Sequence, residues 1–351
     1  MNYKIFGQKT GLRVSELALG TGNFGTGWGH GAGPEVSREI FGRYIDAGGN
    51  FIDTADGYQG GQSEEILSSL ISGIREEIVL ASKYSAGGNT LQTSGSSRKN
   101  MVRSVEESLK RLKTDRIDLY WAHISDHQTP IEEIVRGFDD LVRDGKIVYA
   151  GFSNFPAWRI ASASLLADLR GWSPVAGIQV EYNLIERSAE RDLLPMAEAL
   201  GLGTAFWSPL AGGTLTGKYR NGAMETESRQ NAWKGNLVKG EDGERETNIL
   251  DALESIADSH DARVLDIALA WIRQRHDRSA LSTVTILGPR TLSQLNDNLD
   301  SLKISLTDPE LDLLTSISSI SLGVPHQMIS DSHKGLFGGA EAGVMLKHPV
   351  R

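Results

Sequence analysis

The chain has 351 residues, of which 39% are hydrophobic and 23% charged, and its formal net charge is -9 at pH 7. A negative chain lacks the concentrated Lys and Arg that displace counterions from nucleic-acid phosphates, so this balance argues against a nucleic-acid partner. The chain contains no cysteine, which excludes disulfides, thiolate nucleophiles and cysteine-based metal sites.

The first predicted element is a β-hairpin near the N-terminus. Its strands, residues 3–6 and 12–14, flank a turn that contains Gly7 and Gly11. These opening residues lack the apolar core of a secretion signal, and no run of about 18 apolar residues follows them. We therefore expect a cytoplasmic protein without a membrane partner.

Beyond the hairpin, apolar strand-like runs alternate with amphipathic helical stretches. We predict eight strands, at residues 17–20, 50–53, 78–83, 117–123, 148–153, 177–181, 203–207 and 283–287. Helices are predicted at residues 37–47, 63–72, 98–112, 131–144, 158–169, 190–200, 264–275 and 291–302, with an extra helix at 249–259. Eight β-then-α units imply parallel strands with right-handed crossovers, and the count of eight favours a closed (β/α)8 TIM barrel over an open sheet.

The expected domain organisation is one barrel at residues 1–320 followed by a tail at 321–351 with an extra C-terminal helical segment. Two long segments, residues 22–34 and 210–247, follow the first and seventh strands. In a barrel both would open on the C-terminal face, where active sites are assembled. The tail is rich in glycine and has no clear period, so it either covers the barrel mouth or is partly disordered.

Polar residues close four successive predicted strands. Asp53 ends the second strand, Lys83 the third, His123 the fourth, and Ser153-Asn154 the fifth. Each could by itself be a solvated residue at the rim. Because the carboxyl ends of parallel barrel strands meet at one rim, their coincidence favours a functional site there.

The segment around Asp53 resembles the signature of the aldo-keto reductase superfamily. It reads Asn50-Phe51-Ile52-Asp53-Thr54-Ala55-Asp56-Gly57-Tyr58, followed by Gly61 and Ser63-Glu64. The resemblance extends from about residue 4 to about residue 318 and includes residues 80–83, 118–123, 151–154, 179–183, 207–210 and 288–291. It implies a barrel enzyme that transfers hydride between the nicotinamide of NADP(H) and a carbonyl or alcohol carbon of a small-molecule substrate.

The resemblance implies a catalytic tetrad of Asp53, Tyr58, Lys83 and His123. Carbonyl reduction requires a proton at oxygen as hydride reaches carbon, but a tyrosine, with a pKa of about 10, is a poor donor at neutral pH. A neighbouring ammonium stabilises the phenolate, so we expect Tyr58 to be the general acid and base and Lys83 to tune it. Asp53 would keep the ammonium charged and oriented, and His123 would align the substrate carbonyl.

No Gly-x-Gly-x-x-Gly fingerprint follows the first strand, so a Rossmann-type nucleotide site is not indicated. The resemblance instead implies NADPH or NADP+ lying extended across the rim of the barrel. At the nicotinamide end it implies contacts from Gly20, Thr21, Asp53, Ser153, Asn154, Gln179 and the stacking ring of Trp207.

Toward the other end of the cofactor, the resemblance implies a pyrophosphate site and an adenosine site. The pyrophosphate would contact Ser208, Pro209, Leu210, Gly212 and Lys218, and the adenosine with its 2′-phosphate would contact Gly288, Arg290, Gln294 and Asn298. Arg290 and Lys218 favour NADPH over NADH, because a guanidinium suits phosphate.

Two other functions are consistent with a barrel. The residues also resemble the β subunits of voltage-gated potassium channels, which suggests a cofactor-binding regulatory subunit with little turnover; the short segment before the hairpin argues against that role. A metal-dependent hydrolase is disfavoured, because the predicted strand ends of this sequence carry neither a His-x-His pair nor a histidine with a carboxylate as metal ligands. The substrate stays open, and Trp28 and Trp121 either wall an apolar pocket or pack in loop and core.

Overall fold

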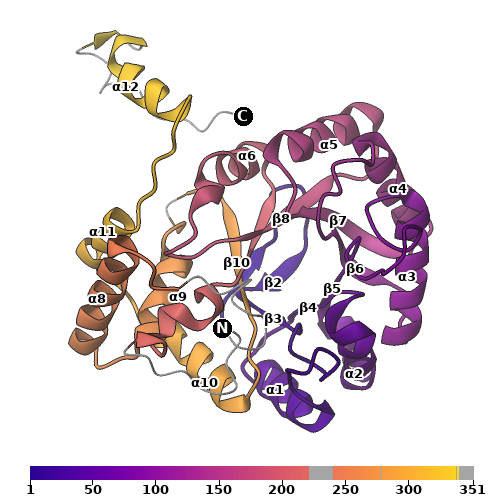
Figure 1. The fold of residues 1–351 in the computed structure, drawn as a ribbon. Helices are drawn as coiled ribbons and strands as arrows, with labels where there is room; N and C mark the ends of the chain where they lie inside the picture. The colour runs from indigo at the N-terminus through magenta and orange to yellow at the C-terminus, as the bar shows by residue number, and fades with distance from the viewer. Residues whose placement is uncertain (221–239, 278, 337, 340–351) are drawn as a thin grey trace.

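Eight parallel strands form a closed barrel in the computed structural model, which describes residues 1–220, 240–277, 279–336 and 338–339 (Figure 1). The strands are β3 (Leu17–Gly20), β4 (Phe51–Asp53), β5 (Val79–Tyr84), β6 (Ile117–Ala122), β7 (Ile147–Ser153), β8 (Val175–Glu181), β9 (Gly203–Trp207) and β10 (Ser282–Leu287). Pairing of β10 with β3, through partners such as Thr285 and Leu17, closes the ring. The predicted (β/α)8 fold is confirmed.

Helices cover the outside of the barrel in the order in which the strands succeed one another. They are α1 (Pro34–Asp46), α2 (Gln62–Ile71), α3 (Arg98–Leu112), α4 (Ile131–Arg143), α5 (Ala157–Arg170), α6 (Leu193–Leu200), α8 (Glu244–Ser259), α9 (Val264–Gln274) and α10 (Leu292–Asp300). In α3, buried Met101, Val105 and Leu112 form the inward face that their spacing predicts. Among the described residues, none of the helices combines the length and apolarity that crossing a bilayer requires.

Three predicted helices begin three or more residues away from the first residue that the structure gives them. The first helix begins at Pro34 instead of residue 37, because proline already has the backbone angle of a helical first turn. The helix predicted at 190–200 is divided into a 3-10 turn, Ser188–Glu190, and α6. The helix predicted at 249–259 begins at Glu244, in a charged first turn that lacks apolar periodicity.

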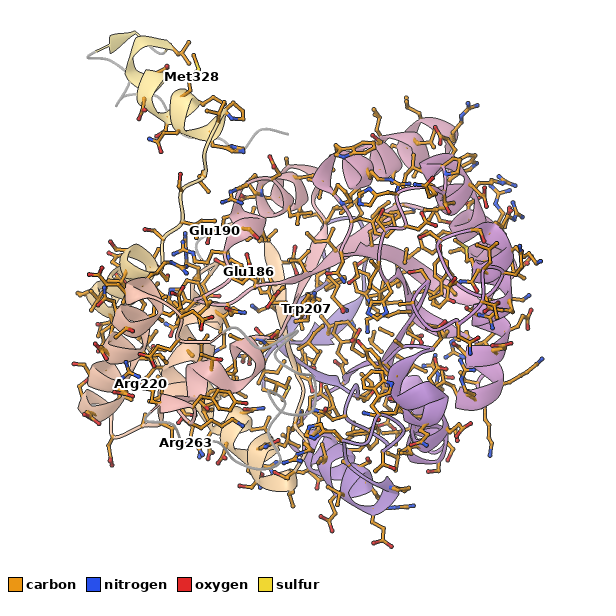
Figure 2. The ribbon with its side chains drawn as sticks, viewed as in Figure 1. Glu186, Glu190, Trp207, Arg220, Arg263 and Met328 are labelled. Carbon is orange, nitrogen blue, oxygen red and sulfur yellow. The ribbon has the colours of Figure 1, made fainter. Side chains whose placement is uncertain are left out.

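Two further helices follow the barrel: α11 (Asp308–Ile317) and α12 (His326–Leu336). A capping box between Thr307 and Glu310 begins α11 and is a sequence signal for it. The segment at 326–336 lacks a clear sequence period and yet is helical. Figure 1 shows α12 apart from the barrel, with Met328 labelled on it in Figure 2, so its described residues do not lie over the strand ends.

The N-terminal hairpin, β1 (Tyr3–Ile5) and β2 (Arg13–Ser15), closes the opposite end of the barrel through Phe6. Phe6 is fully buried, and its ring lies edge-on at 5.9 Å from Phe51 and 6.2 Å from Trp121. A Cβ at Gly177 or Gly203 would lie 2.6 Å from a carbon of that ring, so only glycine leaves room for it. Trp121 therefore belongs to the core of the barrel and does not wall a substrate pocket.

Phe6 acts as a plug at this end of the barrel, so replacing it should lower the stability of the whole fold. We expect Phe6→Ala to lower the free energy of unfolding by about 3–5 kcal/mol, because it leaves a cavity under the barrel that neighbouring rings cannot fill. Urea denaturation followed by circular dichroism measures the change. Leu91→Ala, at a side chain that is 91% exposed, should change it by less than about 0.5 kcal/mol, and equal shifts in the two variants would contradict the plug.

Candidate active site

Three strand ends and one turn bring the predicted tetrad together. Asp53 ends β4, Lys83 lies in β5 and His123 follows β6, while Tyr58 begins the 3-10 turn η1 (Tyr58–Gly61). Lys83 Nζ donates hydrogen bonds to Asp53 Oδ2 at 2.5 Å, to the carbonyl of Thr54 at 2.7 Å and to Tyr58 Oη at 3.2 Å. The structure thus places an ammonium between a carboxylate and a phenol.

The environment of Lys83 keeps its charge. Its side chain is fully buried, and burial by itself lowers the pKa of an ammonium. The Asp53 carboxylate, together with the hydrogen bonds to Asp53 and Tyr58, outweighs that effect and raises the pKa of Lys83 above its usual value. A permanent positive charge therefore lies at hydrogen-bond distance from the phenolic oxygen.

The imidazole of His123 lies edge-on to the Tyr58 ring, with the ring centroids 5.8 Å apart and the planes at 76°. Burial, reinforced by the charge of Lys83, lowers the pKa of His123 to about 3. The imidazole is therefore neutral at physiological pH. Its Nδ1 has no hydrogen-bond partner within the described part of the chain, although buried ring nitrogens normally have one.

Residues from β7, β8 and β9 surround this group. Gln179 Nε2 donates to Asp53 Oδ1 at 2.8 Å, so both carboxylate oxygens are used. Asn154, with a left-handed φ of 53°, donates to the carbonyl of His123 at 3.0 Å and accepts from Trp207 Nε1 at 3.2 Å. Trp207 lies toward the middle of the barrel in Figure 2. All three side chains line the same cavity as Asp53, Tyr58 and His123.

Two adjoining cavities run from the tetrad across the rim. The first, about 430 Å³, is lined by Gly20, Gly22, Asn23, Trp28, Asp53, Tyr58, His123, Ile124, Asn154, Gln179, Trp207, Ser208, Pro209, Ile286 and Gly288. The second, about 280 Å³, includes Asn23, Ser208, Pro209, Leu210, Gly212, Lys218, Gly288, Arg290, Gln294 and Asn298 in its lining. Asn23, Ser208, Pro209 and Gly288 line both, so the cavities form one trough.

Two predicted cofactor residues lie behind the trough instead of in its lining. The hydroxyl of Thr21 is buried and donates to the carbonyl of Asp53 at 3.1 Å. Ser153 is also buried, and its Oγ accepts from Asn154 Nδ2 at 3.0 Å. In this structure both hydroxyls orient residues that do reach the cavity.

The trough wall also depends on residues that the sequence did not single out. Asn23 Nδ2 donates to the carbonyl of Gly288 at 2.8 Å, and Asn183 Nδ2 donates to that of Ser208 at 2.9 Å. Two residues that the sequence did single out also bond to each other: the amide of Arg290 donates to Gln294 Oε1 at 2.8 Å, which joins Arg290 to the first turn of α10. Asn183 lies within the motif at 179–183, which is the one signal that pointed to it.

Backbone shape at the start of the seventh loop is unusual. Ser208 and Ala211 have φ angles of 54° and 50°, and Gly212 and Gly213 have 69° and 106°, all left-handed. Such runs turn the chain tightly and direct successive amides to one side, a common arrangement at anion sites. Ala211, Gly212 and Gly213 begin the 3-10 segment η4 (Ala211–Thr216), and Lys218 lines the smaller cavity together with the two glycines.

The fold and the site together define a class: a (β/α)8 barrel enzyme whose Asp, Tyr, Lys and His side chains meet at the strand ends beside an elongated trough. The chain belongs to the aldo/keto reductase family, whose sequence model matches residues 16–319. Members of this family are oxidoreductases that act on carbonyl and alcohol groups.

Many relatives match the chain, and three of those that match nearly all of it are the following. A putative aryl-alcohol dehydrogenase of Saccharomyces cerevisiae is 32% identical over 343 residues, 93% of this chain and 89% of that protein. An uncharacterized oxidoreductase of Bacillus subtilis is 35% identical over 331 residues, 90% and 96% of the two chains. An aryl-alcohol dehydrogenase of Phanerodontia chrysosporium, named for NADP(+), is 32% identical over 342 residues, 92% and 87%.

The neutral state of His123 can be tested by its titration. Because its pKa of about 3 lies below the roughly 6.5 of an unfolded histidine, the unfolded chain takes up the proton first as the pH falls. The contribution of neutral His123 to the free energy of unfolding is therefore fully present above about pH 6.5 and is lost as the pH falls toward 3. We expect the His123 imidazole NMR signal, assigned with His123→Gln, to stay constant from about pH 8 to pH 5.

The same signal in urea-unfolded protein is the control and should titrate near pH 6.5. A midpoint above pH 5 in the folded protein would mean that His123 carries a charge during catalysis at mildly acidic pH.

Proposed function

We propose that the protein is an NADP(H)-dependent oxidoreductase that reduces aldehydes or ketones to alcohols, or catalyses the reverse reaction, with Tyr58 as general acid and base. The observation that carries the proposal is the contact of Lys83 with both Asp53 and Tyr58 at one end of a trough whose other end includes Lys218 and Arg290. Proton chemistry and phosphate recognition thus share one continuous cavity.

The trough fits an extended dinucleotide. Near the tetrad, Asn154 and Gln179 offer amide groups that suit a carboxamide, and Trp207 offers an aromatic face. The left-handed turn at 208–213 and Lys218 suit a pyrophosphate, and Arg290 at the start of α10 suits a 2′-phosphate. When bound there, the nicotinamide supplies the hydride for reduction or accepts it for oxidation.

The chain's own residues handle the proton. Tyr58 Oη would donate its proton to the carbonyl oxygen as negative charge develops there, and the Lys83 ammonium at 3.2 Å stabilises the phenolate that remains. Asp53 holds that ammonium in place. Neutral His123 lines the same cavity and would hydrogen-bond the carbonyl oxygen without repelling the charge of Lys83.

Apolar side chains around the tetrad favour a substrate with a flat apolar group. Trp28 packs edge-on against Tyr58, with the ring centroids 6.1 Å apart, and Ile124 and Ile286 line the same cavity. Aryl aldehydes and aryl alcohols match such walls, and two of the three relatives described above carry the name aryl-alcohol dehydrogenase. We therefore propose aryl carbonyls as the substrate class.

Removing only the phenolic oxygen tests the role of Tyr58. We expect Tyr58→Phe to lower kcat for benzaldehyde reduction by about 100-fold to 10,000-fold, because the ring stays and the proton donor is lost. Consumption of NADPH at 340 nm measures the rate, and quenching of tryptophan fluorescence should show unchanged NADPH binding.

Tyr3→Phe, in the hairpin at the far end of the barrel, is the matched control and should keep the wild-type rate. Full activity of Tyr58→Phe would refute the acid assignment. Tight NADPH binding by the wild-type protein without turnover of any carbonyl would instead indicate the regulatory role.

The cofactor preference depends on Arg290. We expect Arg290→Ala to weaken NADPH binding by about 10-fold to 100-fold and to leave NADH binding nearly unchanged, because only NADPH carries the 2′-phosphate that a guanidinium would bind. Fluorescence titration with each cofactor measures this. Arg38→Ala, on the exposed face of α1, is the control; an equal loss for both cofactors in Arg290→Ala would show a purely structural role.

A further inference from the structure

The glycine-rich segment between β3 and α1 forms a closed loop beside Tyr58. A bridge between Phe24 and Ala32 joins its two ends. The amide of Gly25 donates to the carbonyl of Ala32 at 2.7 Å, and the amide of Ala32 donates to that of Asn23 at 2.6 Å. Phe24 is fully buried, so the base of the loop is anchored in the core.

Two glutamines from outside the loop bond to it: Gln62 Oε1 accepts from the amides of Thr26 at 2.9 Å and Gly27 at 3.1 Å, and Gln59 makes three further bonds. Gln59 Nε2 donates to the carbonyls of Gly22 at 2.9 Å and His30 at 3.0 Å, and Gln59 Oε1 accepts from the amide of Trp28 at 2.9 Å. The side chain is almost completely buried, with 1% exposed. The side-chain amide of Gln59 thus uses both of its N–H donors on the two limbs of the loop and its oxygen on the tip, and so holds them together.

Glycines let the loop approach this side chain closely. A Cβ at Gly27 would lie 2.3 Å from the carbonyl oxygen of Gln59, and one at Gly25 would lie 2.9 Å from Gln59 Cβ. Any side chain at Gly27 would therefore push the loop away from Gln59. The glycines at positions 25 and 27 therefore leave the space that Gln59 occupies.

The backbone at Gln59 is left-handed, with a φ of 53°, and Gly60 and Gly61 continue the turn at 69° and 98°. A glutamine in this region is strained, and such strain persists where the surroundings hold the residue. The turn lets adjacent side chains serve two partners, because Tyr58 contacts Lys83 while Gln59 contacts the loop.

We propose that Gln59 is a positioning residue that sets substrate specificity by holding Trp28 against the cavity of the tetrad. Trp28 lines that cavity, whereas Gln59 lines neither part of the trough, so Gln59 acts on the substrate through the loop. The inference rests on the proposed function and assigns its aryl specificity to a hydrogen-bonded unit of Gln59 and Trp28.

Gln59→Asn tests this directly, because asparagine tolerates a left-handed backbone but is one methylene too short to reach the loop. We expect the ratio of kcat/KM for benzaldehyde to kcat/KM for propanal to fall about tenfold, the size of effect that a lost apolar pocket contact produces. Gln8→Asn, in the hairpin turn at the opposite end of the barrel, should leave the ratio unchanged.

A double-mutant cycle with Trp28→Ala separates positioning from a general defect. If Gln59 acts through Trp28, adding Gln59→Asn to Trp28→Ala should not lower the ratio further. An equal loss of kcat for both aldehydes in Gln59→Asn, or an additive effect in the double variant, would overturn the proposal.

Hydrogen exchange provides a readout that does not depend on turnover. In Gln59→Asn, amides in a peptide spanning residues 22–32 should exchange at least about tenfold faster than in the wild type, since the loop loses three hydrogen bonds. Unchanged exchange would overturn the positioning role even in an active enzyme. Absence of carbonyl turnover by the wild-type protein would remove the reductase proposal and, with it, the specificity role, whatever the exchange shows.

Discussion

The buried ion pair between Asp53 and Lys83 is the interaction on which the rest of the site depends. Two charges away from water are stable only when their geometry and remaining hydrogen bonds are nearly complete. Here Lys83 uses its three donors on Asp53, Thr54 and Tyr58, and Gln179 takes the second oxygen of Asp53. Removal of either partner would leave an uncompensated buried charge, at a cost of about 3–5 kcal/mol.

The Lys83 ammonium also affects Tyr58 and His123, its two neighbours in the site. The Lys83 ammonium donates a hydrogen bond to Tyr58 Oη, and its charge adds to the effect of burial in lowering the pKa of His123, so the imidazole stays neutral. A phenol bonded to an ammonium therefore lies beside an imidazole that stays uncharged. The packing of the barrel supports this arrangement from the opposite end, where Phe6 and Trp121 fill the interior. Stability and chemistry thus occupy different ends of the same strands.

The turn at Tyr58 connects that chemistry to the substrate wall. Tyr58 and Gln59 are adjacent in sequence, yet one contacts the buried ion pair and the other contacts the loop that carries Trp28. The left-handed backbone from Gln59 to Gly61 makes the divergence possible. A change in this short turn would therefore affect both the position of the Tyr58 phenol and the cavity wall that carries Trp28.

The sequence by itself determined the barrel and the rim positions of Asp53, Lys83 and His123, because apolar periodicity marks each strand and parallel strands end at one face. Tyr58 lies in a turn, where apolar periodicity gives no information, so only the family motif points to it as a site residue. Tertiary structure alone decided that Trp121 is core while Trp28 faces the cavity, and that Gln59 bonds a loop about 30 residues away. Side chains of one type acquire different roles from the neighbours that folding brings to them, and those neighbours are distant in the chain.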